Sequence, residues 1–112
     1  MVLPAIGDVV LVPFPFSDLS QAKVRPAICL ADVGRGDWIL CQITSNPYGD
    51  PAAISLPAYD FVSGGLLVAS YARPGKLFTA DCRLLVKSVG RLNPQALQHI
   101  LAAVTAYFTL PP

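Results

Sequence analysis

The sequence predicts a mostly β protein, a small barrel of five to seven short strands with a C-terminal helix. Short runs of Val, Ile, Leu and aromatic residues are separated by clusters of Gly, Pro, Asn and Asp, which favour turns. Only the segment after Asn93 spaces its apolar residues three and four apart, as a helix does. Several short strands with one closing helix are typical of a small barrel.

The N-terminal half is expected to form three strands, one long loop and one tight turn. Pro13 and Pro15 lack the amide donors that a central ladder needs, so the first strand is expected to end before them. A polar segment long enough to act as a flap follows. The expected strands are 9–12, 26–31 and 38–44, with the flap at 17–24 and a hairpin turn at 32–37.

The C-terminal half is expected to alternate short strands with turns before the helix. Asn93 is a good N-cap and Pro94 a good first helical residue. The apolar stripe of the helix is expected to be Leu97, Ile100, Leu101, Val104 and Phe108. Before the helix we expect a loop at 45–51, strands at 54–56, 66–73 and 78–81, turns at 63–65 and 74–75, and mixed strand and turn at 84–91.

Length and composition bound the organisation of the protein. The 112 residues suit one domain, 1–112, with a single core. A hydrophobic share of 54% with a charged share of 13% favours a buried interface, most simply that of a homodimer. No run approaches the roughly 20 apolar residues that span a bilayer, and the start lacks a signal-peptide pattern. We expect a cytoplasmic protein without membrane contact.

The composition argues against metal-dependent and histidine-based chemistry. Cys29, Cys41 and Cys82 are odd in number and far apart, which indicates neither a disulfide framework nor a zinc site, and the first two are expected to pack as small hydrophobes. His99 is the only histidine and has no second ligand at metal-binding spacing. We therefore expect no metal and no cofactor. An enzyme of this composition would work with Arg, Thr, Ser and backbone groups.

Arg25 stands at the border between the polar loop and a buried strand. Pro26 disfavours helical backbone at Arg25 and so holds it extended. The run 27–31 is continuously apolar, as in a strand covered on both faces. A guanidinium at such a border is either structural or functional. With Lys23 it begins a basic face that would hold a phosphate backbone, although a solvated surface is the common alternative.

One reaction suits a site without histidine or metal, namely cleavage of RNA by its own 2′-hydroxyl. The nucleophile is already in the substrate, so the protein has to stabilise the extra negative charge of a phosphorane and hold the backbone in line. The planar fork of donors on Arg25 suits the first task. Thr44 ends a strand that we expect to pair with the strand of Arg25, which would set a hydroxyl beside it.

Five blocks of the sequence carry a resemblance to a known family. They are 7–19 (Gly-Asp-Val-Val-Leu-Val-Pro-Phe-Pro-Phe-Ser-Asp-Leu), 25–27 (Arg-Pro-Ala), 41–45 (Cys-Gln-Ile-Thr-Ser), 70–79 (Ser-Tyr-Ala-Arg-Pro, then Lys-Leu-Phe-Thr) and 89–92 (Val-Gly-Arg-Leu). In their order and spacing, from about residue 6 to residue 108, they resemble the PemK/MazF family of toxins.

The resemblance implies a compact SH3-like barrel, a homodimer, and a metal-independent endoribonuclease of a toxin-antitoxin system, an mRNA interferase neutralised by a cognate antitoxin. The catalytic arginine of the family falls on Arg25 and its catalytic threonine on Thr44. The expected products from single-stranded RNA are a 2′,3′-cyclic phosphate and a 5′-hydroxyl. Because an arginine pKa lies above about 12, we assign charge stabilisation to Arg25 and orientation of the phosphate to Thr44.

Other residues are candidates for contact with RNA, each beside a structural alternative. Arg73 would bind phosphate or pair with an Asp at the dimer seam, and Gln42 would contact a base or be a satisfied structural amide. Phe14 and Phe16 would stack on bases or, the favoured alternative, fill the core or the seam. The roles of Tyr48 and Tyr71 are open. The full set for RNA or phosphate is Lys23, Gln42, Ser45, Arg73 and Lys76.

A second class of function is a toxin-fold protein that binds a partner without catalysis. It would be an inactive relative or a gyrase-directed CcdB-like toxin. The gyrase version is disfavoured because CcdB-like proteins act through a tail carrying Trp-Gly-Ile, whereas this chain ends in Leu110-Pro111-Pro112.

Overall fold

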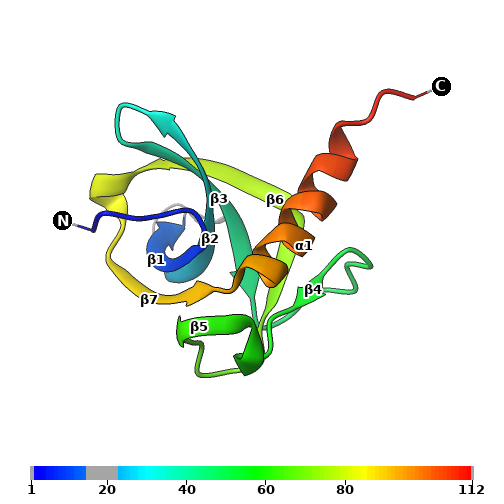
Figure 1. The fold of residues 1–112 in the computed structure, drawn as a ribbon, viewed down its shortest axis with the longest axis horizontal. Helices are drawn as coiled ribbons and strands as arrows, with labels where there is room; N and C mark the ends of the chain where they lie inside the picture. The colour runs from blue at the N-terminus through cyan, green and yellow to red at the C-terminus, as the bar shows by residue number, and fades with distance from the viewer. Residues whose placement is uncertain (1, 15–22, 112) are drawn as a thin grey trace.

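The computed structural model describes residues 2–14 and 23–111, in which seven strands form one antiparallel sheet with the order β4-β6-β3-β2-β1-β7-β5. The sheet curls into a half-barrel and α1 packs across it (Figure 1). The predicted fold class, a mostly β barrel of this family type with a C-terminal helix, is confirmed. The strands are β1 (Asp8–Phe14), β2 (Lys23–Gly34), β3 (Asp37–Thr44), β4 (Ile54–Ser55), β5 (Phe61–Gly64), β6 (Tyr71–Asp81) and β7 (Lys87–Leu92).

Two apolar clusters occupy opposite faces of the sheet, because successive side chains of a strand point to opposite sides. We call them the inner cluster and the helix-side cluster. In β3, for example, Leu40 belongs to the inner cluster and Cys41 to the helix-side cluster. The inner cluster contains Val10, Val12, Ala27, Cys29, Trp38, Leu40, Ala80 and Leu85. The helix-side cluster includes Val9, Ile28, Leu30, Cys41, Ile43, Ala72, Ala96, Ile100 and Val104.

The helix α1 (Pro94–Thr105) begins where the sequence predicts. The Asn93 side chain accepts a hydrogen bond from the Ala96 amide at 2.8 Å, and Pro94 is the first helical residue. The placement of Phe108 on the buried stripe is wrong, because the chain tightens into the 3-10 turn η3 (Ala106–Phe108) and leaves its ring 74% exposed. In the part of the chain that the structure describes, no helix is long and apolar enough to cross a membrane.

The expected bounds of the first two strands are too short. β1 continues through Pro13, which pairs with Val24, and β2 begins at Lys23. A proline is tolerated there because β7 accompanies β1 only as far as Leu11, so Pro13 has one neighbouring strand instead of two. Lys23 and Val24 thus belong to the strand rather than to the predicted flap, whose residues 17–22 lie outside the described residues.

Two further predictions about strands are wrong. Residues 61–64 form the edge strand β5 on β7, where the sequence predicts a turn at 63–65. Residues 66–70 are not a strand, and β6 runs from Tyr71 through Pro74 and Gly75 to Asp81. Residues 73–76 bulge opposite Gln42, and in a bulge the missing donor of a proline costs no ladder bond. The 3-10 turn η1 (Ala58–Asp60) lies between β4 and β5, and the 3-10 turn η2 (Cys82–Leu84) lies between β6 and β7.

The close approach of β5 to β7 leads to a first prediction, which concerns the stability of a Gly64 variant. Gly64 and Gly49 share left-handed φ values of +63° and +71°, so replacing either by alanine incurs similar backbone strain. A Cβ at Gly64 would also overlap the Val89 carbonyl, whereas a Cβ at Gly49 meets nothing within 4 Å. Gly64→Ala should therefore lower the free energy of unfolding by roughly 1–3 kcal/mol more than Gly49→Ala, measured by urea denaturation. Equal losses would contradict the predicted overlap.

Candidate active site

The pairing of β2 with β3 brings Arg25 and Thr44 to one side of the sheet. The two strands form the predicted antiparallel hairpin, in which Ala27 lies opposite Gln42. Arg25 lies two residues before Ala27, and Thr44 lies two residues after Gln42. By strand alternation both side chains point to the side of Ala27. Ala27 belongs to the inner cluster, so the two side chains continue its face at the end of the half-barrel.

The backbone of Arg25 is paired with β1. It pairs with Val12 of β1, a residue of the inner cluster, and Pro26 pairs with Leu11. The side chain is half-buried. A cation beside an apolar cluster interacts more strongly with an anion than it would in bulk water, because fewer water dipoles screen the two charges.

Thr44 is buried, with 9% of its surface exposed, and its hydroxyl is already oriented. Oγ1 accepts a hydrogen bond from the Asn46 amide at 3.1 Å and donates to the Asn46 carbonyl at 3.0 Å. A hydroxyl has one donor and two lone pairs, so one lone pair of Thr44 is left for another donor. The local turn thus fixes where the hydroxyl points before any ligand binds.

Gln42 lies on the same face as the two candidates, opposite Ala27 and two residues before Thr44 on β3. Its side chain is 7% exposed, and within residues 2–14 and 23–111 its Oε1 atom makes no hydrogen bond. A buried acceptor without a partner costs about 1–3 kcal/mol. Gln42 is therefore not the satisfied structural amide that the sequence left open. It offers an acceptor to a ligand on this face.

Arg73 reaches the same face from β6. Tyr71 pairs with Thr44, and Arg73 follows on the same side two residues later, at the start of the bulge. Its Nε donates to Asp50 Oδ2 at 3.0 Å. That hydrogen bond is the main cause that lowers the pKa of the Asp50 carboxyl. Arg73 thus pairs with an aspartate of its own chain.

A buried thiol ties the bulge that carries Arg73. Cys41 Sγ donates to the Arg73 carbonyl at 3.3 Å, and burial raises the pKa of this thiol to about 12. Burial likewise raises the pKa of Cys29 to about 12. Both thiols therefore stay protonated at neutral pH, so neither is a thiolate nucleophile. Both side chains are buried, as the sequence predicts.

The remaining candidates lie on three different elements, because Lys23 begins β2, Ser45 follows β3 and Lys76 lies in the bulge of β6. Lys23, Ser45 and Lys76 are exposed. Phe14 stacks on Phe78 with ring centroids 4.5 Å apart, which is a packing role, while Phe16 lies outside the described residues.

Two residues that sequence reasoning missed hold the loop between β3 and β4. Asn46 bonds to the Thr44 hydroxyl, and Asp50 pairs with Arg73. The available signal was local: Asn and Asp beside Pro47 and Gly49 are residues whose side chains bond to nearby backbone in turns.

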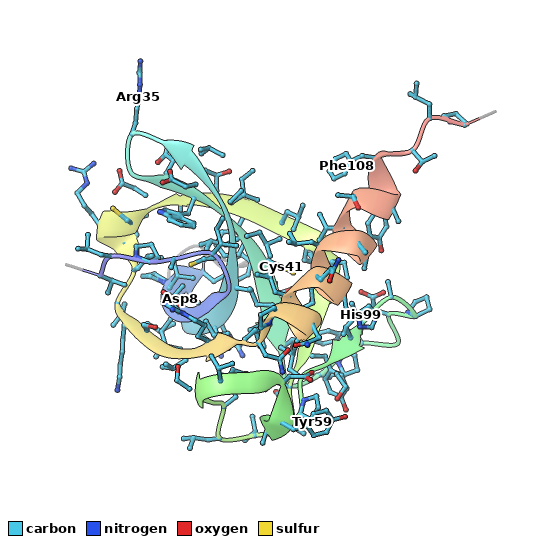
Figure 2. The ribbon with its side chains drawn as sticks, in the orientation of Figure 1. Asp8, Arg35, Cys41, Tyr59, His99 and Phe108 are labelled. Atoms are coloured by element: carbon cyan, nitrogen blue, oxygen red, sulfur yellow. The ribbon has the colours of Figure 1, made fainter. Side chains whose placement is uncertain are left out.

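A separate groove lies between α1 and the β4 segment. Its volume is about 910 Å³ and its lining is mainly apolar, including Ile54, Pro57, Tyr59, Ala103 and Tyr107. His99 is exposed on α1 and faces this groove (Figure 2). Among residues 2–14 and 23–111, no group of three His, Cys, Asp or Glu side chains is placed to hold a metal ion.

A family model described as PemK-like, MazF-like toxin of type II toxin-antitoxin system matches residues 5–108. This chain belongs to that family. None of the curated protein sequences matches it. The PemK/MazF-like toxin is also similar in fold to solved structures at low sequence identity, so these show the fold alone.

Three of these structures illustrate the similarity. A MazE–MazF complex from Deinococcus radiodurans has a TM-score of 0.76 and 20% identity, covering 99% of this chain and 100% of that one. An endoribonuclease in complex with its cognate antitoxin from a mycobacterial species has a TM-score of 0.73 and 16% identity, with coverage of 100% and 99%. The Mycobacterium tuberculosis toxin MazF-mt6 has a TM-score of 0.71 and 16% identity, with coverage of 94% and 99%.

The ion pair of Arg73 with Asp50 makes a second prediction for this PemK/MazF-like toxin. Because the folded-state pKa of Asp50 is lowered, its carboxylate stabilises the fold above its unfolded pKa of about 3.9, and this contribution is lost as pH falls through the lower folded value. The Tm difference between wild type and Asp50→Asn should be full at pH 6 and shrink below about pH 4. A difference that stays constant into strong acid would contradict the pairing.

Proposed function

We propose that this toxin is a metal-independent endoribonuclease that cleaves single-stranded RNA. The supporting observation is that Arg25 and Thr44 share one side of neighbouring strands in a chain that matches the toxin family over residues 5–108. The 2′-oxygen forms a bond to phosphorus and the bond to the 5′-oxygen breaks. The 2′-hydroxyl loses its proton and the leaving oxygen gains one, which yields a 2′,3′-cyclic phosphate and a 5′-hydroxyl.

Arg25 contributes most where the negative charge is greatest. Its guanidinium offers two parallel N–H donors to the non-bridging oxygens of the scissile phosphate. Those oxygens carry more charge in the phosphorane than in the ground state. The interaction therefore strengthens as the reaction proceeds, which is the condition for raising kcat.

Thr44 orients the reacting phosphate. Its hydroxyl is 3.0 Å from the Asn46 carbonyl that it donates to, so donation to a phosphate oxygen requires an exchange of partners when RNA binds. The Asn46 amide, 3.1 Å away, keeps the oxygen in place during that exchange. Gln42 offers its free Oε1 to a donor group of the RNA from the same face.

Exposed cationic side chains bind the RNA backbone on either side of the scissile phosphate. Lys23 is exposed at the start of β2 and Lys76 is exposed on β6, the two strands that flank β3, and Ser45 follows Thr44 directly. The two Nη groups of Arg73 supply further donors, since only Nε is used by Asp50 among the described residues. Such phosphate contacts fix register without reading sequence.

We further propose that the toxin forms a homodimer and binds a cognate antitoxin. The mycobacterial and Deinococcus structures of similar fold contain an antitoxin or MazE. The mainly apolar groove beside α1 is lined in part by the exposed rings of Tyr59 and Tyr107, a surface suited to a protein partner.

The cleavage proposal makes a third prediction. The purified toxin should cut single-stranded RNA in the presence of EDTA, and Arg25→Ala or Thr44→Val should reduce the rate at least about 100-fold, as removal of a transition-state donor does. Arg35→Ala and Thr79→Val, which alter an arginine and a threonine on exposed parts of the hairpin turn and β6, should cleave normally. Gel assays with end-group analysis measure both rate and products.

The outcomes separate the possible functions. Full activity in Arg25→Ala or Thr44→Val would remove the proposed site. If folded wild-type protein leaves RNA uncut and binds an antitoxin, it is a binding protein without catalysis. A Tm measurement on each variant distinguishes loss of chemistry from loss of fold.

The exposed side chain of Lys76 leads to a fourth prediction. Lys76→Ala should weaken binding to single-stranded oligonucleotides of all sequences to a similar degree. It should also reduce the slope of log affinity against log salt by about 0.7, the value for one phosphate contact on a single strand. Fluorescence anisotropy over a salt series measures this slope, and an unchanged slope would exclude Lys76 from the phosphate track.

A further inference from the structure

We propose that Tyr48 is a preformed platform on which one RNA base stacks beside the scissile phosphate. The inference rests on the proposed function and names a subsite of the same site. It is carried by a strained turn, an exposed ring backed by a cation, and a hydrogen-bonded connection to Thr44.

Tyr48 occupies a backbone conformation that its side chain disfavours. The Asp50 amide donates to the Pro47 carbonyl at 2.9 Å, which closes a four-residue turn. Both central residues have positive φ, 54° at Tyr48 and 71° at Gly49, as in a type I′ turn. The first central position of that turn favours Asn, Asp or Gly, and a bulky residue there is a genuine outlier.

Burial of the ring does not offset this strain, because Tyr48 is 69% exposed. What the turn achieves instead is to hold the ring beside Arg73, whose guanidinium carbon is 5.9 Å from the ring centroid. Asp50, the last residue of the turn, accepts a hydrogen bond from the Nε of Arg73. The ring, the cation and the carboxylate thus form one unit whose exposed part is aromatic. Strain of this kind is kept where a site needs a side chain in a fixed place.

The platform is tied directly to the candidate catalytic threonine. Asn46 bonds through its backbone to the Thr44 hydroxyl and through its Oδ1 to the Tyr48 amide, at 2.9 Å. Arg73 lies on the same side of the sheet as Thr44, one strand away. The position of the ring relative to the Thr44 hydroxyl is therefore set before RNA arrives, which avoids the entropic cost of ordering a loop on binding.

The chemistry of the platform fits an unpaired nucleobase. Bases of single-stranded RNA stack on aromatic side chains, and the contact tolerates any base because each has a π face. Because Asp50 uses only Nε of Arg73 among the described residues, the Nη groups are left to meet the phosphate adjoining the stacked base. A base held here and a phosphate held at Arg25 and Thr44 would stretch the backbone across the cleavage point, which favours in-line attack.

The test uses a substitution that should raise the stability of the fold and weaken the binding of RNA. Tyr48→Asn creates the Asn-Gly pair that a type I′ turn favours, so it should raise the Tm. It should also weaken binding of an uncleavable oligonucleotide, deoxy at the mapped cut site, by roughly 5- to 150-fold, the range for losing one stacked base. Tyr48→Phe should bind like wild type. Leu67→Asn, which alters another exposed apolar side chain, should leave binding unchanged.

An abasic scan identifies the base. Each nucleotide near the cut site is replaced in turn by an abasic residue, and affinity is measured with wild type and Tyr48→Asn. At one position the abasic change should weaken binding to wild type but not to Tyr48→Asn, because both changes remove the same contact. Losses that add at every position would overturn the proposal.

The remaining outcomes distinguish this inference from the function beneath it. Wild-type protein that neither cuts nor binds RNA would remove the proposed function and the subsite together. Wild-type protein that cuts RNA while Tyr48→Asn binds it equally well would remove the subsite alone. A lower Tm for Tyr48→Asn, or a change in its sedimentation without a change in RNA affinity, would make Tyr48 a structural or protein-contact residue and overturn the platform.

Discussion

The register of the β2–β3 hairpin is the constraint on which the candidate site depends. Ala27 opposite Gln42 decides that Arg25 and Thr44 point to the same side of the sheet. A slip of one residue would turn the side chains of the slipped strand to the other face, so Arg25 and Thr44 would no longer share a side. Such a slip is costly because Ile28 and Cys29 pack into clusters on opposite faces. The apolar packing that stabilises the half-barrel therefore also aligns its polar end.

The loop that follows Thr44 is fixed in position by hydrogen bonds although it is exposed to solvent. Asn46 and Asp50 use their side chains to close local turns and to hold Arg73. The loop consequently orients the Thr44 hydroxyl of β3, anchors Arg73 of β6 and exposes the ring of Tyr48. The cost is visible in the left-handed backbone of Tyr48. The Gln42 Oε1 acceptor, which has no hydrogen-bond partner in the part of the chain that the structure describes, is a second such cost on the same face.

The site and the proposed protein-binding surface lie on different parts of the chain. The face of Arg25, Gln42 and Thr44 continues the inner cluster, whereas the apolar groove lies between α1 and β4. Alternation along β3 explains how one strand serves both sides: Cys41 and Ile43 pack toward the helix while Gln42 and Thr44 face the other way.

Local chemistry by itself determined much of this protein. Asn93 and Pro94 specify the helix start, the glycines near Arg35 specify the hairpin, and the family blocks select Arg25 and Thr44 as the residues to test. Only the tertiary structure decided that residues 61–64 form a strand, that β6 passes through Pro74, and that Arg73 pairs with Asp50. Each of these depends on a partner more than 20 residues away, and a local pattern carries no record of that partner. Propensity and spacing describe what a segment favours alone, while pairing across the sheet decides which preference is realised.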